Sequence, residues 1–177
     1  MKITIITGSP HKNGTTALLT EKFIEGAKES GHDIYRFDSA FKDIHPCIAC
    51  EKCHNEDKGC VFKDDMEELN TQLIETDAVV LVSPIYYYDI NAQLKTVIDR
   101  FYSNDEKLHG NKKAVLMLTM ADTSMESADG AVATFKGITN FLGWNVVGTI
   151  IGKNCWTLDM LMETDYPQQA YDLGKNM

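Results

Sequence analysis

Residues 2–16 read KITIITGSPHKNGTT, and this stretch decides the fold. Its first six residues are an apolar, β-branched run that is typical of a strand, and the run ends directly at Gly8. An amphipathic pattern follows and predicts a helix over residues 16–30, with Thr15 or Thr16 as its N-cap. A strand joined to a helix by a short glycine-containing loop is the opening of a βαβ unit.

The same alternation continues along the chain. Further strands are predicted at residues 33–38, 78–83, 113–119 and 144–151. Apolar residues at helical spacing predict helices within 64–74, 94–101 and about 130–142. Five such units predict an α/β fold with a doubly wound, five-stranded parallel sheet, and we expect the flavodoxin-like strand order 2-1-3-4-5. In that fold the ligand lies outside the carboxyl ends of the strands.

The length of 177 residues predicts a single domain spanning 1–177, because domains average roughly 150 residues. Two segments depart from the regular alternation. Residues 39–63, after the second strand, are polar, carry cysteines and have no clear period, so we expect a long functional loop or a small inserted subdomain. Residues 165–177 are expected to form a C-terminal helix of about two turns, with Pro167 near its start and Gly174 near its end.

The chain is acidic, with 17 Lys and Arg residues against 26 Asp and Glu residues and a net charge of −9. Nucleic acid is therefore not an expected partner, because nucleic-acid binding needs a basic face. Lys95 and Arg100 are expected to pair with Asp99 or with backbone groups. No apolar stretch reaches the about 18 residues of a spanning helix, and the N-terminus lacks a signal-peptide pattern. We expect a cytoplasmic protein that does not associate with a membrane.

The loop after the first strand suits a phosphate monoester. It contains two glycines together with the hydroxyl and amide side chains of Ser9, Asn13, Thr15 and Thr16. Short polar side chains and backbone N–H groups at a helix N-terminus can hold a dianion without many cations. The loop is neither a Walker A sequence nor a G-x-G-x-x-G motif. The alternative is a polar turn that only begins the helix.

Residues 83–91, SPIYYYDIN, follow the third strand and place three tyrosines at the same edge of the sheet. A planar heteroaromatic ligand would explain this composition, because such a ligand stacks on aromatic rings. Three successive side chains cannot all face one ligand, so we expect one or two of Tyr86, Tyr87 and Tyr88 to be functional. The alternative is packing on the sheet edge.

Cysteines are clustered in the loop of residues 39–63. Cys47, Cys50, Cys53 and Cys60 form a C-x2-C-x2-C-x6-C array that resembles ferredoxin-type ligation of a [4Fe-4S] cluster. Zinc is a second candidate, with His45 and His54 in reach as substitute ligands, although zinc sites usually separate two C-x2-C pairs by a longer span. Free or disulfide-forming thiols without any cluster are the third. The remaining cysteine, Cys155, is expected to be a packed thiol.

Three motifs together resemble the NADPH-dependent FMN reductase and iron-sulfur flavoprotein family of flavodoxin-like proteins. ITGSPHKNGTT is similar to the phosphate loop of that family, and SPIYYYDINAQLKTVIDR is similar to its flavin-ring loop and following helix. PCIACEKC, followed by GCVFKDDM, is similar to the cysteine motif of the iron-sulfur branch. The chain departs from many relatives at His11, where they have Arg, and at Thr15, where they often have Asn.

The resemblance implies an FMN-dependent NAD(P)H oxidoreductase that passes electrons from the nicotinamide cosubstrate through the flavin to a small-molecule or protein acceptor. It further implies a homodimer or homotetramer. The implied phosphate contacts are Ser9, His11, Asn13, Gly14, Thr15 and Thr16, and the implied ring contacts are Pro84, Ile85, Tyr86, Tyr87 and Tyr88. One alternative is an electron carrier with FMN and a [4Fe-4S] cluster, fed by a ferredoxin-like donor. Another is a non-catalytic zinc-binding module.

Overall fold

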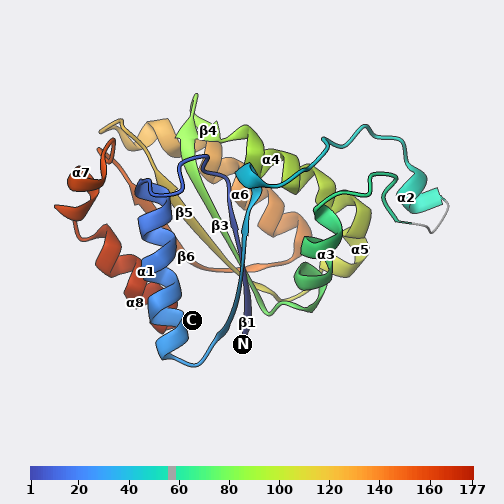
Figure 1. The fold of residues 1–177 in the computed structure, drawn as a ribbon, viewed down its shortest axis with the longest axis horizontal. Helices are drawn as coiled ribbons and strands as arrows, with labels where there is room; N and C mark the ends of the chain where they lie inside the picture. Colours follow the sequence, from blue (N-terminus) through green and yellow to red (C-terminus); the bar gives the residue numbers. More distant parts are fainter. Residues whose placement is uncertain (56–58) are drawn as a thin grey trace.

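A parallel sheet forms the centre of the molecule (Figure 1). Its strands follow the order β2-β1-β3-β5-β6, which is the predicted order 2-1-3-4-5 of the five parallel strands. The strands are β1 (Lys2–Thr7), β2 (Asp33–Asp38), β3 (Ala78–Tyr86), β5 (Lys113–Thr119) and β6 (Asn145–Gly152). The computed structural model describes residues 1–55 and 59–177. The remaining part of the expected 39–63 loop, residues 56–58, lies outside the described residues.

Helices cover both faces of the sheet (Figure 1). One face is covered by α1 (Thr15–Glu29), α7 (Leu158–Met162) and α8 (Tyr166–Lys175), and the other by α3 (Met66–Glu75), α4 (Ala92–Asp99), α5 (Asp105–Leu108) and α6 (Asp129–Leu142). The short elements are η1 (Ser39–Phe41), α2 (Lys52–Asn55), η2 (Arg100–Asn104) and η3 (Met125–Ala128). Helix α2 lies at the outer end of the cysteine loop, away from the sheet. Within the described residues, none of the helices is long and apolar enough to span a bilayer.

The two sides of the core follow from alternation along the strands. In β3, Val79 and Leu81 belong to the core under α3, α4 and α6, whereas Val80 and Val82 belong to the core under α1 and α8. Because both faces of this strand are covered, its sequence is a continuous apolar run rather than an alternating one. The central strands are therefore fully buried, and only their carboxyl ends and loops are available to a ligand.

The structure corrects two details of the sequence prediction. Helix α1 begins at Thr15 with Gly14 as N-cap, so the prediction that Thr15 or Thr16 would cap the helix was wrong. The loop expected from residue 84 is partly strand: β3 continues to Tyr86 and pairs with the short antiparallel strand β4 (Asp89–Ile90). Both differences lie at the carboxyl edge of the sheet, where local propensity gives little information.

Candidate functional site at the carboxyl edge

A cavity of about 660 Å³, which we call the edge cavity, lies at the carboxyl ends of β1, β3 and β5. Its size is within the range of cofactor sites, roughly 300–1,000 Å³. The loop after β1 and the end of β3, which the sequence placed at one edge, meet around it. All predicted cofactor contacts except Tyr87 and Tyr88 line it: Ser9, His11, Asn13, Gly14, Thr15, Thr16, Pro84, Ile85 and Tyr86. Their binding roles remain predictions.

The loop between β1 and α1 leaves the start of the helix open to the edge cavity. The N-cap Gly14 provides no side-chain hydrogen bond to the first turn. The hydroxyls of Thr15 and Thr16 lie 3.1 and 3.4 Å from the hydroxyl of Thr119 on β5 instead. The N–H groups of the first helical turn are thus available to an anion, which the helix dipole also favours.

The same loop is tightly folded. The Ser9 hydroxyl accepts a hydrogen bond from the His11 N–H at 3.2 Å, and the Gly14 N–H donates to the His11 carbonyl at 3.2 Å. A Cβ atom at Gly14 would lie 2.9 Å from that of His11, so any larger residue would force the loop open. The loop therefore combines a close turn, buried hydroxyls and an uncapped helix start, which together fit the phosphate group of FMN.

The three tyrosines lie on a tight hairpin between β3 and β4. Tyr86 pairs with Asp89, so Tyr87 and Tyr88 form the two-residue turn. Both have positive φ, 47° and 69°, which is unusual for bulky residues. Tyr86 lines the edge cavity, whereas the Tyr87 side chain is fully exposed. The geometry agrees with the expectation that not all three tyrosines face one ligand.

Asn91 fixes the two loops of the edge cavity to each other. Its side chain is 1% exposed. The side-chain amide donates a short hydrogen bond to the Gly8 carbonyl, and its oxygen lies 3.1 Å from the Ser83 hydroxyl. A Cβ atom at Gly8 would overlap the Asn91 side chain, which explains the glycine at this position. Sequence reasoning missed Asn91, because nothing in the chain indicates which distant group it binds.

Several cavity residues were also missed. Thr119, Met120 and Ala121 line the edge cavity at the end of β5, and Trp156 and Leu158 line it beyond β6. The position of Met120 after a predicted strand was a usable signal, but the loop matched no known motif. Trp156 is 77% exposed, an unusual position for a large aromatic ring. Cys155 is buried, as expected for a packed thiol, and also contacts the cavity.

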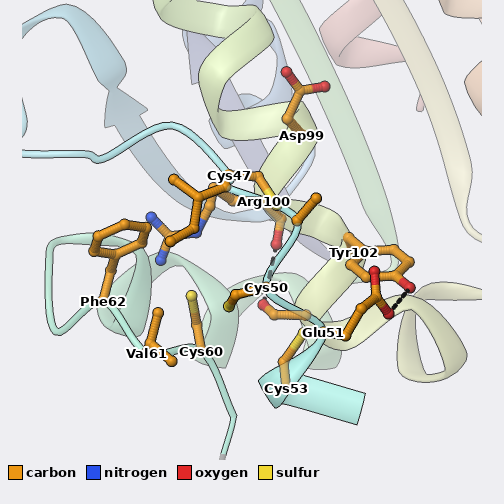
Figure 2. Close-up of a pocket in the computed structure, with 13 residues that line it drawn as sticks. Cys47, Cys50, Glu51, Cys53, Cys60, Val61, Phe62, Asp99, Arg100 and Tyr102 are labelled. Atoms are coloured by element: carbon orange, nitrogen blue, oxygen red, sulfur yellow. Dashed lines mark hydrogen bonds between the residues drawn. The ribbon is translucent and has the colours of Figure 1, made fainter. Parts of the chain in front are cut away.

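The four clustered cysteines line a second, smaller pocket, the cysteine pocket, under the outer loop (Figure 2). Ala49 and Glu51, with φ of 51° and 58°, turn the backbone on either side of Cys50. Gly59, with φ of 72°, lets the backbone turn directly before Cys60. Burial and the nearby thiols raise the pKa of Cys53 above its ordinary value. The sequence array is thus brought together in space.

The cysteine pocket brings the four thiols to one place but encloses little space. Its enclosed volume is about 20 Å³, which is little more than the space of one water molecule. A cluster would require the loop to move outward, and the exposed positions of Cys47 and Cys50 permit this. Among described residues, no three His, Cys, Asp or Glu side chains converge on a single metal position. An iron-sulfur cluster needs no such convergence, because each thiolate binds a different iron.

The two histidines considered as zinc ligands contact other groups. The His54 ring nitrogen Nε2 lies 2.8 Å from the Tyr102 carbonyl oxygen. The His45 ring stacks on Phe62 with centroids 4.8 Å apart. Neither histidine lines the cysteine pocket.

Lys95 on α4 and Arg100 at the start of η2 have different partners. Lys95 pairs with Asp99 at 2.6 Å, as predicted. Arg100 instead pairs with Asp64, which lies 36 positions earlier in the chain. It also donates to a backbone group, the His45 carbonyl, as predicted. The backbone alternative of the prediction is thus confirmed for Arg100, which points into the molecule under the cysteine loop, whereas Asp99 points to solvent and pairs with Lys95.

The doubly wound sheet with a phosphate-type loop at its carboxyl edge defines a flavodoxin-like protein. The chain belongs to the NADPH-dependent FMN reductase family, whose family model matches residues 1–156. This confirms the resemblance seen in the three motifs.

Curated relatives agree with this family, and solved structures share the fold. An iron-sulfur flavoprotein of Archaeoglobus fulgidus is 36% identical over 164 residues, which cover 88% of this chain and 83% of the relative. An iron-sulfur flavoprotein of Methanocaldococcus jannaschii is 37% identical over 100 residues, covering 56% of this chain and 51% of the relative. This 100-residue match covers only about half the length of each of four curated relatives, all of them iron-sulfur flavoproteins. The NAD(P)H:quinone oxidoreductase from Methanothermobacter marburgensis shares the fold, with a TM-score of 0.76, 18% identity and coverage of 99% and 96% of the two chains.

Proposed function

We propose that this chain is an FMN-dependent NAD(P)H oxidoreductase that passes electrons from reduced nicotinamide to an acceptor. The observation that carries the proposal is the edge cavity, where a phosphate-type loop and the end of β3 meet across about 660 Å³. Bound FMN would accept hydride from NAD(P)H and release the electrons to the acceptor.

In this proposal the protein binds and orients the cofactor. Residues of the β1 loop, Ser9 to Thr16, hold the phosphate through hydroxyls and the open helix start. Pro84, Ile85 and Tyr86 contact the ring, and Asn91 keeps these two groups at a fixed separation. Tyr87 and Tyr88 were implied as ring contacts, but their position on the hairpin favours a role outside the cavity of the same chain.

The test is cofactor analysis followed by an anaerobic titration. Protein purified with excess FMN should release FMN, identified by mass spectrometry, and NADH or NADPH should bleach its absorbance. Protein that takes up no flavin, or that releases mainly FAD, would contradict the proposal. Comparing the two nicotinamides in the same titration identifies the preferred donor.

The second candidate is an electron carrier with FMN and a [4Fe-4S] cluster, fed by a ferredoxin-like donor. The cysteine pocket favours it, because all four thiols of the sequence array line one space. The two sites lie at opposite ends of α4, a helix about 12 Å long. Anaerobic reconstitution should give four irons per chain in this case, lost on Cys→Ser change at Cys47, Cys50, Cys53 or Cys60 and kept in Cys155→Ser. Stoichiometric zinc without flavin would support a zinc-binding module.

We also propose a single domain over residues 1–177 that acts in the cytoplasm as a homodimer or homotetramer. The exposed Trp156 beside the edge cavity supports a subunit contact there. Light scattering after gel filtration tests the oligomeric state, and cell fractionation tests the location.

A further inference from the structure

The cysteine pocket has a buried positive charge behind it. The side chains of Arg100 and Asp64 are 2% and 1% exposed, respectively, and Arg100 is among the largest fully buried side chains of the described residues. The chain has only two arginines and a net charge of −9. Placing one of these cations inside the molecule, where burial opposes its charge, needs a physical reason.

The pair is held rigidly. Arg100 Nη1 donates to Asp64 Oδ2 at 2.6 Å, and Nη2 donates to Asp64 Oδ1 at 3.1 Å, so the contact is bidentate. Arg100 Nη1 also donates to the His45 carbonyl at 2.7 Å, and Asp64 accepts a hydrogen bond from the His45 N–H at 3.0 Å. His45 and Asp64 lie on the two sides of the cysteine array in the sequence. The pair therefore fastens both ends of the loop to η2.

The guanidinium also faces one of the cysteine sulfur atoms, that of Cys60. Arg100 lines the cysteine pocket, and in Figure 2 its guanidinium lies beside Cys60. Its Nε is buried and has no hydrogen-bond partner among the described residues. An arginine guanidinium is always protonated in proteins, so it keeps its positive charge beside Cys60.

Stability alone does not explain this arrangement. Buried ion pairs commonly contribute no more than apolar residues of the same size, because their desolvation cost offsets their attraction. A fixed cation beside a thiolate-ligated cluster has a clear electrostatic effect, however. Reduction of a [4Fe-4S] cluster adds one electron without forming or breaking a bond, and nearby positive charge and hydrogen bonds to sulfur favour the more negative state.

We propose that Arg100 is a positioning residue of the cysteine pocket: fixed by Asp64, it presents a permanent positive charge to Cys60 and raises the reduction potential of a cluster bound there. This inference rests on the proposed cluster-containing function. It assigns Asp64 the opposite electrostatic role, since its carboxylate partly neutralises the guanidinium.

The test measures the midpoint potential of the reconstituted cluster in the full chain by an EPR-monitored dithionite titration. Arg100→Gln should make the equilibrium constant for reduction of the cluster at least tenfold smaller, which lowers the midpoint potential by about 59 mV for one electron. Arg100→Lys should recover much of this loss. Asp64→Asn should shift the potential upward, because it leaves the guanidinium charge uncompensated. Lys95→Gln, an exposed cation on α4, is the matched control and should leave the potential unchanged.

The opposite signs separate electrostatics from structure, because a residue that only held the loop would act in the same direction when either partner is removed. Iron per chain is measured first for each variant. Should Arg100→Gln fail to fold, the upward shift in Asp64→Asn still decides the question. Variants with full iron content and unchanged midpoint potentials would overturn the inference about Arg100 but leave the cluster function standing. Wild-type protein that takes up no iron would overturn the cluster function and this inference with it.

Discussion

Removing the Asn91 side chain should destabilise the contact between the two loops that line the edge cavity. In the native protein this buried amide donates to the Gly8 carbonyl, and its oxygen lies within hydrogen-bond distance of the Ser83 hydroxyl. In Asn91→Ala, Ser83 keeps its contact to the Pro84 carbonyl, but the Gly8 carbonyl loses this donor. An unsatisfied buried acceptor costs about 1–3 kcal/mol, so the free energy of unfolding should fall by about that amount.

Asn91→Ala should weaken FMN binding more than a substitution at a distant site does, because the loops that it releases are those that contact the proposed cofactor. We expect urea denaturation to report the stability loss and fluorescence titration to report an FMN affinity at least tenfold weaker, which corresponds to about 1.4 kcal/mol. Asn140→Ala, at an exposed position on α6, is the matched control and should change neither quantity by more than about 0.5 kcal/mol. Wild-type FMN affinity in a destabilised Asn91→Ala protein would refute the reasoning that Asn91 sets the loop separation.

Three further predictions follow from particular contacts. Tyr86→Ala should weaken FMN binding and Tyr86→Phe should preserve it, whereas Tyr87→Ala, which removes a fully exposed ring, should leave the affinity unchanged in the same titration. Gly174→Ala should destabilise the protein by about 1–3 kcal/mol in urea melts, because its Cβ would overlap a backbone carbonyl of α1, while Gly137→Ala, with open space around it, should be stabilising by about 0.5–1 kcal/mol. Burial opposes the charge of Asp64, but the hydrogen bond from Arg100 outweighs this effect and lowers the pKa of Asp64 in the folded state. The ionised carboxylate therefore contributes its full stabilisation at pH values above the ordinary pKa of an aspartate. This stabilisation is lost as the pH falls through the lowered pKa of the folded state. Asp64→Asn should therefore flatten the loss of stability between about pH 5 and pH 2, and an unchanged acid profile would count against the pair.

The sequence predicted the framework well because its signals are local. Each strand is a short apolar run, and each long helix has an apolar face, so the order of elements followed from patterns within about 15 residues. The strand order was confirmed because α/β chains of this kind have few alternative topologies. The edge cavity also followed, since the carboxyl ends of parallel strands meet at one edge.

Local details at that edge were less predictable. Capping by threonine is the usual preference, but Thr15 and Thr16 bind Thr119, which lies 104 and 103 positions away. The hairpin of β3 and β4 was also missed, because Tyr87 and Tyr88 are unfavourable at positive φ and no Asn-Gly or Gly pair marks the turn.

The sequence by itself determined the fold class, the family and the two groups of residues that we propose bind cofactors. Only the tertiary structure decided which distant side chains hold those groups in place. Asn91 binds Gly8 across 83 positions, and Arg100 binds Asp64 across 36. Such contacts leave no periodic signal in the chain, because a single buried polar side chain is chosen by the groups that folding brings beside it, and a buried donor or charge must find a partner there.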